Sequence, residues 1–171
     1  MLERTGVVTF KGGPMTLVGN EVKVGEKAPG FAALANDLSE VSLSSFKGKV
    51  VVIAAAPSLD TPVCDTQTRR FNAEAGKLGD EVVVLTLSMD LPFAQKRWCG
   101  AAGITHVQVL SDHRNANFAR AYGLLLRDLR LLARAVFVID REGVVSYAEV
   151  VKEVTDEPDY QAALRAVKEL I

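Results

Sequence analysis

The hydrophobic positions of this chain follow two patterns along its length. In the first, short runs are apolar at nearly every position, which is typical of strands buried on both faces of a sheet. In the second, apolar residues recur every three or four positions, which is typical of amphipathic helices. The apolar runs predict strands at residues 50–56, 82–87, 107–110 and 135–139. The amphipathic stretches predict helices at residues 62–78, 92–102, 115–124 and 160–171.

This order of elements predicts an α/β fold. Strands that alternate with helices of this length are joined by right-handed crossovers, so a central sheet carries helices on both faces. Residues 7–10 and 15–18 flank a Lys-Gly-Gly-Pro turn and predict an N-terminal β-hairpin. A turn at residues 140–143 predicts that residues 144–151 return as an antiparallel strand. Because the sequence contains no repeat and no linker, we expect one domain over residues 1–171.

Composition and charge narrow the class of protein. The chain has 171 residues, is 49% hydrophobic and has a net charge of -1, which gives no electrostatic footprint for nucleic acid or an anionic membrane. No apolar run approaches the ~20 residues of a membrane-spanning helix. The first residues lack the basic and apolar regions of a secretory signal, so we expect a cytoplasmic protein. Two cysteines and two histidines are too few, and too far apart, for a closed zinc site.

The first cysteine stands at a predicted helix start, shortly after a buried strand. Thr61 is a favourable N-cap and Pro62 suits the first helical position, so Cys64 falls in the first turn. Backbone N–H groups there lack partners inside the helix, which favours the thiolate and provides donors for a polar oxygen. The neighbouring Asp65 opposes the thiolate. Since cysteine is also among the most often buried residues, a structural role for Cys64 stays open from position alone.

Residues 57–64 read Pro-Ser-Leu-Asp-Thr-Pro-Val-Cys, which fits the pattern Pro-x-x-x-Thr-x-x-Cys. In this motif the chain resembles the peroxiredoxins, and within them the bacterial thiol peroxidases that carry two redox cysteines. Further matches follow in the same order at residues 88–99, 112–115, 133–136 and 157–160. The resemblance covers essentially the whole chain, and it implies a thioredoxin-like fold with a central mixed sheet flanked by helices.

The resemblance also implies roles for four residues around the first cysteine. Cys64 would be the peroxidatic cysteine, which attacks the O–O bond of the peroxide and becomes a sulfenic acid. Thr61 would hydrogen-bond the peroxide, and Pro57 would shield the sulfur from water. Arg134 would lie against the sulfur, where a fixed cation stabilises the charge that develops on the leaving oxygen. Without the resemblance, Arg134 would be interpreted as a solvated charge at the end of a strand.

The second cysteine, Cys99, lies near the end of a predicted helix, in a setting that does little to activate a thiol. The resemblance implies that Cys99 is the resolving cysteine, which closes an intrachain disulfide with Cys64 that thioredoxin then reduces. Because a disulfide needs Cα atoms within about 7 Å, we expect local unfolding of at least one helix end. The resemblance further implies hydrogen peroxide and organic hydroperoxides as substrates, a homodimer, and no metal, haem, flavin or nicotinamide cofactor.

One segment departs from the family pattern. Residues 124–132, Leu-Leu-Leu-Arg-Asp-Leu-Arg-Leu-Leu, contain no glycine or proline, although members of the family usually carry them there. These leucines and helix formers predict either a helical turn packed on a partner chain or an apolar rim at the substrate entrance.

Other functional classes fit the sequence less well. A general thiol–disulfide oxidoreductase usually carries a Cys-x-x-Cys pair, but Cys64 is followed by Asp-Thr-Gln. A binding domain that had lost the chemistry would lack Thr61 or Arg134, and both are present. A cysteine-protease dyad would need His106 or His113 beside a cysteine, and no motif links them. The sequence therefore favours the peroxidase.

Overall fold

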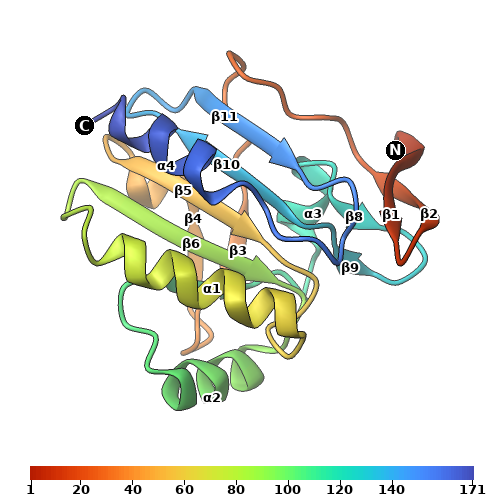
Figure 1. Cartoon of the computed structure of the whole chain (residues 1–171), viewed down its shortest axis with the longest axis horizontal. Coiled ribbons are helices and arrows are strands. Elements are labelled where there is room, and N and C mark those ends of the chain that lie inside the picture. Colours follow the sequence, from red (N-terminus) through yellow and green to blue (C-terminus); the bar gives the residue numbers. More distant parts are fainter.

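A computed structural model describes all 171 residues of the chain (Figure 1). The helices are Pro62–Ala75 (α1), Pro92–Ala102 (α2), Asn117–Ala121 (α3) and Tyr160–Lys168 (α4), and Leu43–Phe46 form a 3-10 turn. The larger sheet contains the strands Ala32–Leu34 (β3), Glu40–Ser42 (β4), Val50–Ala55 (β5), Val82–Ser88 (β6), Gln108–Ser111 (β7), Ala135–Ile139 (β10) and Val145–Val150 (β11). Its strand order is β11-β10-β5-β6-β7-β3-β4.

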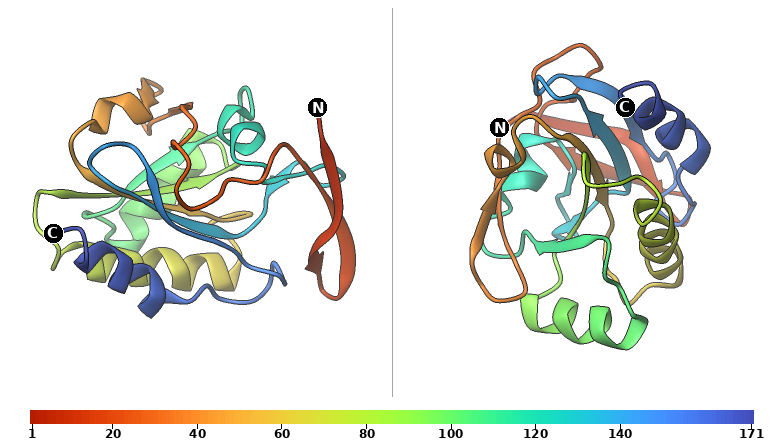
Figure 2. Two further views of the ribbon diagram at one scale, coloured as in Figure 1. Left: turned by 90° about the horizontal axis from the view of Figure 1, so that it is seen from above. Right: turned by 90° about the vertical axis from the view of Figure 1, so that its left-hand side faces the viewer.

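The larger sheet is mixed, as predicted. Strands β5, β6 and β7 are parallel, whereas β10 runs antiparallel to β5, and β11 runs antiparallel to β10. Helices α1 and α2 form the crossovers from β5 to β6 and from β6 to β7. Helices α1 and α4 cover one face of the sheet, and α3 lies on the other (Figure 2). This topology places the start of α1 at the carboxyl end of β5, the edge at which sites collect in α/β sheets.

The central strand β5 is buried on both faces. All six of its residues are buried, and they alternate between two hydrophobic cores. Val51 and Ile53 belong to the core that contains Phe118 of α3. Val52 belongs to the core that contains Phe71 of α1. The prediction that an all-apolar run forms a strand covered from both sides is confirmed.

The smaller sheet joins the N-terminal hairpin to the leucine-rich segment. The hairpin strands, Glu3–Phe10 (β1) and Gly13–Val18 (β2), are paired as predicted, and both begin earlier than predicted. The short strands Leu125–Leu126 (β8) and Leu131–Leu132 (β9) pair with each other, and β8 also pairs with β2. The chain turns between β8 and β9 with Arg130 in the left-handed region, at φ 52°. The leucine-rich segment is therefore a small hairpin.

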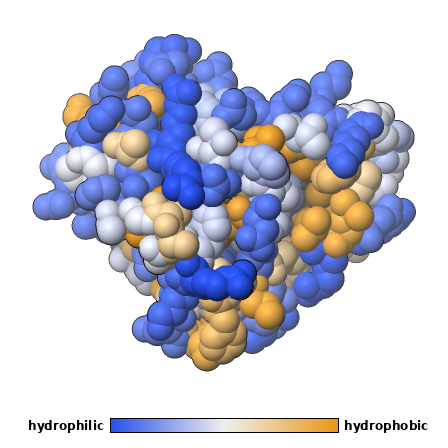
Figure 3. Space-filling view, turned by 60° about the horizontal axis from the view of Figure 1, so that its bottom comes forward, coloured by the Kyte–Doolittle hydropathy of each residue, from blue (hydrophilic) through white to orange (hydrophobic).

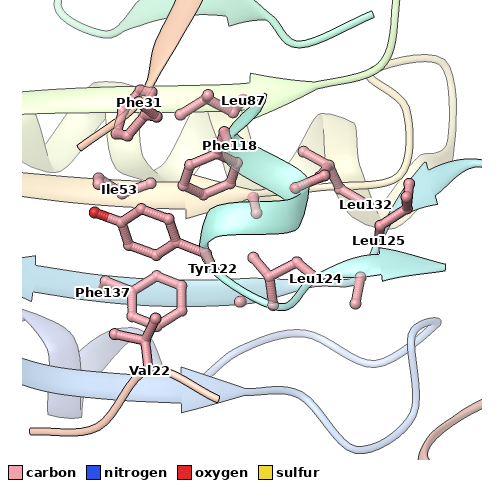
Figure 4. Packing of buried hydrophobic residues seen from close by; sticks show 14 of the residues in the cluster. Val22, Phe31, Ile53, Leu87, Phe118, Tyr122, Leu124, Leu125, Leu132 and Phe137 are labelled. Carbon is pink, nitrogen blue, oxygen red and sulfur yellow. The ribbon is translucent and has the colours of Figure 1, made fainter. Parts of the chain in front are cut away.

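Most leucines of this segment are core residues, and the predicted helical turn within residues 124–132 is wrong. Leu124 and Leu132 are fully buried and belong to one cluster with Phe118 and Tyr122 (Figure 4). Only Leu129 is well exposed among the leucines of the segment. Strand pairing with the N-terminal hairpin and burial against aromatic rings outweigh the helix propensity of leucine. The segment therefore forms a hairpin and no helical turn, and its buried leucines cannot form an exposed apolar rim.

The helices follow the predicted positions with shorter ends. The bounds of α2 agree with the prediction, whereas α1 ends three residues early and α4 also ends three residues early. Helix α3 covers only half of the predicted stretch. Ala116 adopts φ 50°, which is not helical, so the helix begins only at Asn117. None of these helices is both long enough and apolar enough to cross a membrane.

Glu153 connects the N-terminal hairpin to the loop after β11. Its carboxylate accepts hydrogen bonds from Thr9 Oγ1 at 2.9 Å, from the backbone N–H of Gly12 at 2.8 Å and from the backbone N–H of Thr155 at 2.9 Å. These bonds favour the ionised form. The N–H groups of Thr155 and Gly12 are the main reason that the pKa of Glu153 falls from 4.5 to about 2.

We expect Glu153→Gln to lower the melting temperature at neutral pH and to have no effect in strong acid. A depressed pKa in the folded state stabilises the fold above the unfolded-state pKa of 4.5, and this contribution disappears as the pH falls through about 2. The difference between wild type and variant, measured by thermal melting, should therefore shrink as the pH is lowered from 5 toward 2. Glu142→Gln, which alters an exposed carboxylate, is the control. A difference that is constant over this range would contradict the role of the ionised carboxylate.

Candidate active site

Cys64 lies in the first turn of α1, as the sequence predicts. Thr61 is the N-cap residue, with extended backbone at φ -89° and ψ 146°, and Pro62 is the first helical residue. The hydroxyl of Thr61 does not cap the helix, because it donates to the carbonyl oxygen of Ser58 at 3.0 Å. The first-turn N–H groups therefore have no side-chain cap. Cys64 itself is 0% exposed and is not part of a disulfide.

Arg134 is buried against the sulfur of Cys64. Its guanidinium Nη2 lies 3.2 Å from Cys64 Sγ, and Nε donates to the carbonyl oxygen of Val154 at 2.9 Å. The side chain is 2% exposed, and none of the ion pairs in the structure includes it. A buried cation without an anion is costly. The anion that this site can offer is the thiolate of Cys64, so the interpretation of Arg134 as a solvated charge is wrong.

Gln67 holds the guanidinium in place, a role that was not predicted from the sequence. Its Oε1 accepts from Arg134 Nη1 at 2.8 Å, while its Nε2 faces the carbonyl oxygen of Ala55 at 3.4 Å. The amide is fully buried, so its two ends are fixed by one donor and one acceptor. The spacing along the chain could have identified it. Gln67 follows Cys64 by three residues on one helix, which places both side chains on the same face.

The loop that leads into α1 is held by Asp90, which follows the neighbouring strand β6. Pro57 is buried in this loop, two residues after the end of β5. Ser58 Oγ donates to Asp90 Oδ1 at 2.7 Å, and the backbone N–H of Leu59 donates to Asp90 Oδ2 at 2.8 Å. Asp90 also accepts from Ser88 Oγ at 2.8 Å. This network fixes the loop beside the sulfur, and it was not predicted, because it joins residues about 30 positions apart.

Cys99 occupies a different environment, on α2. It is half-buried and lines a cavity of about 390 Å³ together with Asn36, Ile104 and Val107. Burial raises the pKa of the Cys99 thiol, and a hydrogen bond from the side chain of Asn36 opposes that rise. Burial is the larger effect, and the raised pKa agrees with the expectation that Cys99 is the less reactive thiol at rest. The two cysteines are not bonded to each other.

The remaining candidate features take no part in the site. No hydrogen bond joins the side chain of His106 or His113 to a cysteine, so the protease dyad has no support. The largest cavity, about 850 Å³, contains His106 and Gly76 at the far end of α1 from Cys64, and no cysteine lines it. No cluster of three or more His, Cys, Asp or Glu side chains is arranged to hold a metal ion.

The site can therefore perform nucleophilic chemistry at one sulfur. A buried thiol lies beside a guanidinium that has no carboxylate partner, at a helix start with free N–H groups. These donors favour the thiolate and can stabilise negative charge on an oxygen that leaves beside it. The structure brings Cys64 and Arg134 together, and it leaves Cys99 on a separate helix.

The chain is similar in sequence to one family of known proteins. The Redoxin family model matches residues 23–164. The thiol peroxidase of Bacillus subtilis is 59% identical to this chain over 164 residues, which is 96% of this chain and 98% of the relative. The thiol peroxidase of Halalkalibacterium halodurans is 60% identical over 161 residues, which is 94% of this chain and 96% of the relative.

Solved structures extend the comparison to the fold. The crystal structure of a peroxiredoxin-like protein from Aquifex aeolicus superposes with a TM-score of 0.91 at 47% identity, over 98% of each chain. A thiol peroxidase from Chromobacterium violaceum superposes with a TM-score of 0.83 over 95% of each chain. That second likeness, at 21% identity, supports the fold alone.

Proposed function

The chain belongs to the redoxin family as a thiol peroxidase, and from this premise we propose that Cys64 is the sulfur that the peroxide oxidises. One observation carries the proposal. The guanidinium of Arg134 is buried, has no carboxylate partner, and lies 3.2 Å from Cys64 Sγ. A cation in this place stabilises the negative charge that develops as the Cys64 sulfur attacks, whereas burial raises the pKa of the Cys99 thiol.

In the first step, the Cys64 thiolate attacks one oxygen of the peroxide. An S–O bond forms and the O–O bond breaks, which gives a Cys64 sulfenic acid. The second oxygen leaves as hydroxide or alkoxide and takes up a proton, so the products are water or an alcohol. Arg134 stabilises this leaving oxygen, because its fork of N–H donors can face both the sulfur and the peroxide.

Thr61 and Pro57 prepare the site for this step. Since the Thr61 hydroxyl hydrogen is donated to Ser58, the hydroxyl oxygen keeps lone pairs that can accept the O–H of a hydroperoxide. Pro57 offers no N–H and is buried in the loop that Asp90 holds, which suits a residue that keeps water away from the sulfur. Both roles are carried over from the family, because Thr61 and Pro57 occupy the matching positions of its signature.

In the second step, the Cys99 thiolate attacks the sulfur of the Cys64 sulfenic acid. An S–S bond forms, the S–O bond breaks, and the oxygen leaves as hydroxide, which becomes water after protonation. Thioredoxin is the proposed reductant of this Cys64–Cys99 disulfide. The separation of the two thiols on different elements supports a labile disulfide, because local rearrangement is needed to close it.

We further propose that the enzyme acts as a homodimer, as the resemblance implies, and that it works in the cytoplasm. Most leucines of residues 124–132 are buried in the core and are not available for a dimer contact, and Leu129 is the one that is well exposed. On the face shown in Figure 3, hydrophobic residues gather in patches separated by hydrophilic ones. Leu91 and Phe93, at the start of α2, are among the exposed apolar side chains of the chain.

The proposed function is tested by the stoichiometry of peroxide consumption. Without a reductant, the fully reduced wild type should consume one equivalent of hydrogen peroxide per chain and then stop, because both thiols are used in one disulfide. With thioredoxin, thioredoxin reductase and NADPH, consumption should continue. Failure to consume the first equivalent would overturn the assignment of Cys64. Consumption of one equivalent without any turnover would overturn the assignment of thioredoxin as reductant.

A further inference from the structure

Helices α1 and α2 are joined by three side chains that the proposed chemistry does not use. Trp98 Nε1 donates to Asp65 Oδ1 at 3.0 Å, and Arg69 Nε donates to Asp65 Oδ2 at 2.9 Å. The guanidinium of Arg69 also lies 5.6 Å from the centre of the Trp98 ring. We refer to Asp65, Arg69 and Trp98 as the Asp65 clasp. Asp65 is its hub, because each carboxylate oxygen accepts from a different helix.

The Asp65 clasp is next to both redox cysteines along the chain. Asp65 directly follows Cys64 on α1, and Trp98 directly precedes Cys99 on α2. Arg69 extends the connection, since its Nη1 faces the carbonyl oxygen of Ala102 at the end of α2 at 3.4 Å. Any displacement of the first turn of α1 relative to the last turns of α2 must therefore alter the Asp65 clasp.

We expect closure of the disulfide to require such a displacement, because the two thiols lie on different helices and in different surroundings. Cys64 is fully buried beside Arg134, whereas Cys99 lines a cavity with Asn36, and the thiols are not bonded. A disulfide brings the two Cα atoms within about 7 Å of each other, with the Cβ vectors pointing together. Helix ends with few buried contacts open most readily. The hydrogen bonds of the Asp65 clasp are among those that oppose this opening.

We propose that Asp65 is a positioning residue that sets the rate of the resolving step, and with it the resistance of Cys64 to overoxidation. The proposal rests on the proposed function. After the first peroxide has been reduced, the Cys64 sulfenic acid has two fates. It condenses with the Cys99 thiolate after the helices open, or it attacks a second peroxide while they are closed, which forms another S–O bond, breaks another O–O bond and gives a sulfinic acid. A tighter clasp lengthens the time in which the second reaction can occur.

The direction of the effect follows from which state the clasp stabilises. Weakening the clasp leaves the closed state dominant, so the first oxidation, which uses that state, keeps its rate. The open state becomes more populated, so disulfide formation becomes faster. Loss of one charge-assisted hydrogen bond that is partly open to solvent corresponds to about a threefold to tenfold change in that population.

The test compares Asp65→Ala and Trp98→Phe with wild type. Trp98→Phe removes the N–H donor and keeps an aromatic ring, so it isolates the hydrogen bond if Asp65→Ala also weakens the start of α1. Reduced protein is mixed with hydrogen peroxide, quenched in acid at set times, alkylated and weighed by mass spectrometry. This separates thiol, sulfenic, disulfide and sulfinic forms. Lys77→Ala is the matched control, because it breaks a pair with Glu74 on α1 that does not reach α2.

We expect both variants to form the disulfide about threefold to tenfold faster, and to need a correspondingly higher peroxide concentration for half of Cys64 to become sulfinic acid. The rate of the first oxidation in Trp98→Phe, and the behaviour of Lys77→Ala, should match wild type, whereas Asp65→Ala also removes a negative charge beside Cys64 and is compared only by its disulfide formation. Unchanged or slower disulfide formation in Trp98→Phe would overturn the proposal. A wild type that forms no sulfenic acid and no disulfide would instead overturn the proposed function, which this experiment reports separately.

Discussion

Replacing Cys64 by serine is expected to abolish peroxide reduction, whereas replacing Cys99 by serine should leave one turnover per chain. Only Cys64 has a buried guanidinium against its sulfur and a helix start that favours negative charge. A serine hydroxyl is not ionised by this environment and is not oxidised by peroxide. Without Cys99, the Cys64 sulfenic acid has no intrachain thiol to condense with, so the protein stalls after the first peroxide.

The two variants are compared by peroxide consumption without a reductant. Cys64→Ser should consume none, and Cys99→Ser should consume one equivalent quickly and then more slowly, as sulfinic acid accumulates. The variants are matched controls for each other, since each removes one sulfur and keeps a side chain of similar size. Equal consumption by both would contradict the division of labour between the cysteines, and loss of all consumption in Cys99→Ser would give Cys99 the first step.

Removal of the Arg134 side chain is expected to slow the first oxidation about 10²- to 10³-fold, the usual cost of one preorganised donor at a developing oxyanion. That factor corresponds to about 3–4 kcal/mol of transition-state stabilisation. Arg134→Ala also leaves the amide oxygen of Gln67 and the carbonyl oxygen of Val154 without their donor. Arg134→Lys keeps the charge, but it cannot reproduce three bonds made from one planar fork, so it should recover only part of the rate.

The measurement is the second-order rate constant of Cys64 oxidation in a Cys99→Ser background, where the first step is isolated. Arg114→Ala is the matched control, because Arg114 forms an exposed pair with Glu40 that is distant in sequence from both cysteines. We expect the order wild type, then Arg134→Lys, then Arg134→Ala. A rate constant that is the same in all of these proteins would remove Arg134 from the mechanism and leave Thr61 and the helix start.

The strongly patterned parts of the fold are predictable from the sequence. A run such as residues 50–56, apolar at every position, has few alternatives to a strand in the middle of a sheet. The start of α1 is also predictable, because Thr61 and Pro62 suit the N-cap and the first helical position, and this start fixes where Cys64 lies. The predicted site therefore agrees with the structure wherever position along one element determines it.

The rest depends on contacts between distant parts of the chain. Strands β3 and β4, three residues each, are too short to give a period, and the hairpin of β8 and β9 looks helical by composition. The helical turn predicted within residues 124–132 was wrong because the pairing of β8 with β2 decides the conformation there. Asp90 and Gln67 were missed because their roles depend on which loop and which guanidinium the fold brings to them.

The central claim is that oxidation by one peroxide links the sulfur atoms of Cys64 and Cys99 in a disulfide. The decisive measurement is peptide mapping under non-reducing conditions, after reduced wild type has been mixed with one equivalent of hydrogen peroxide. We predict one new species, in which the peptides that carry Cys64 and Cys99 are linked by a disulfide, with no stable oxidation elsewhere. The same mixture with Cys99→Ser should carry its modification on Cys64. An oxidised Cys99 beside an unmodified Cys64, or a disulfide that joins two chains in place of Cys64–Cys99 within one, would contradict the account.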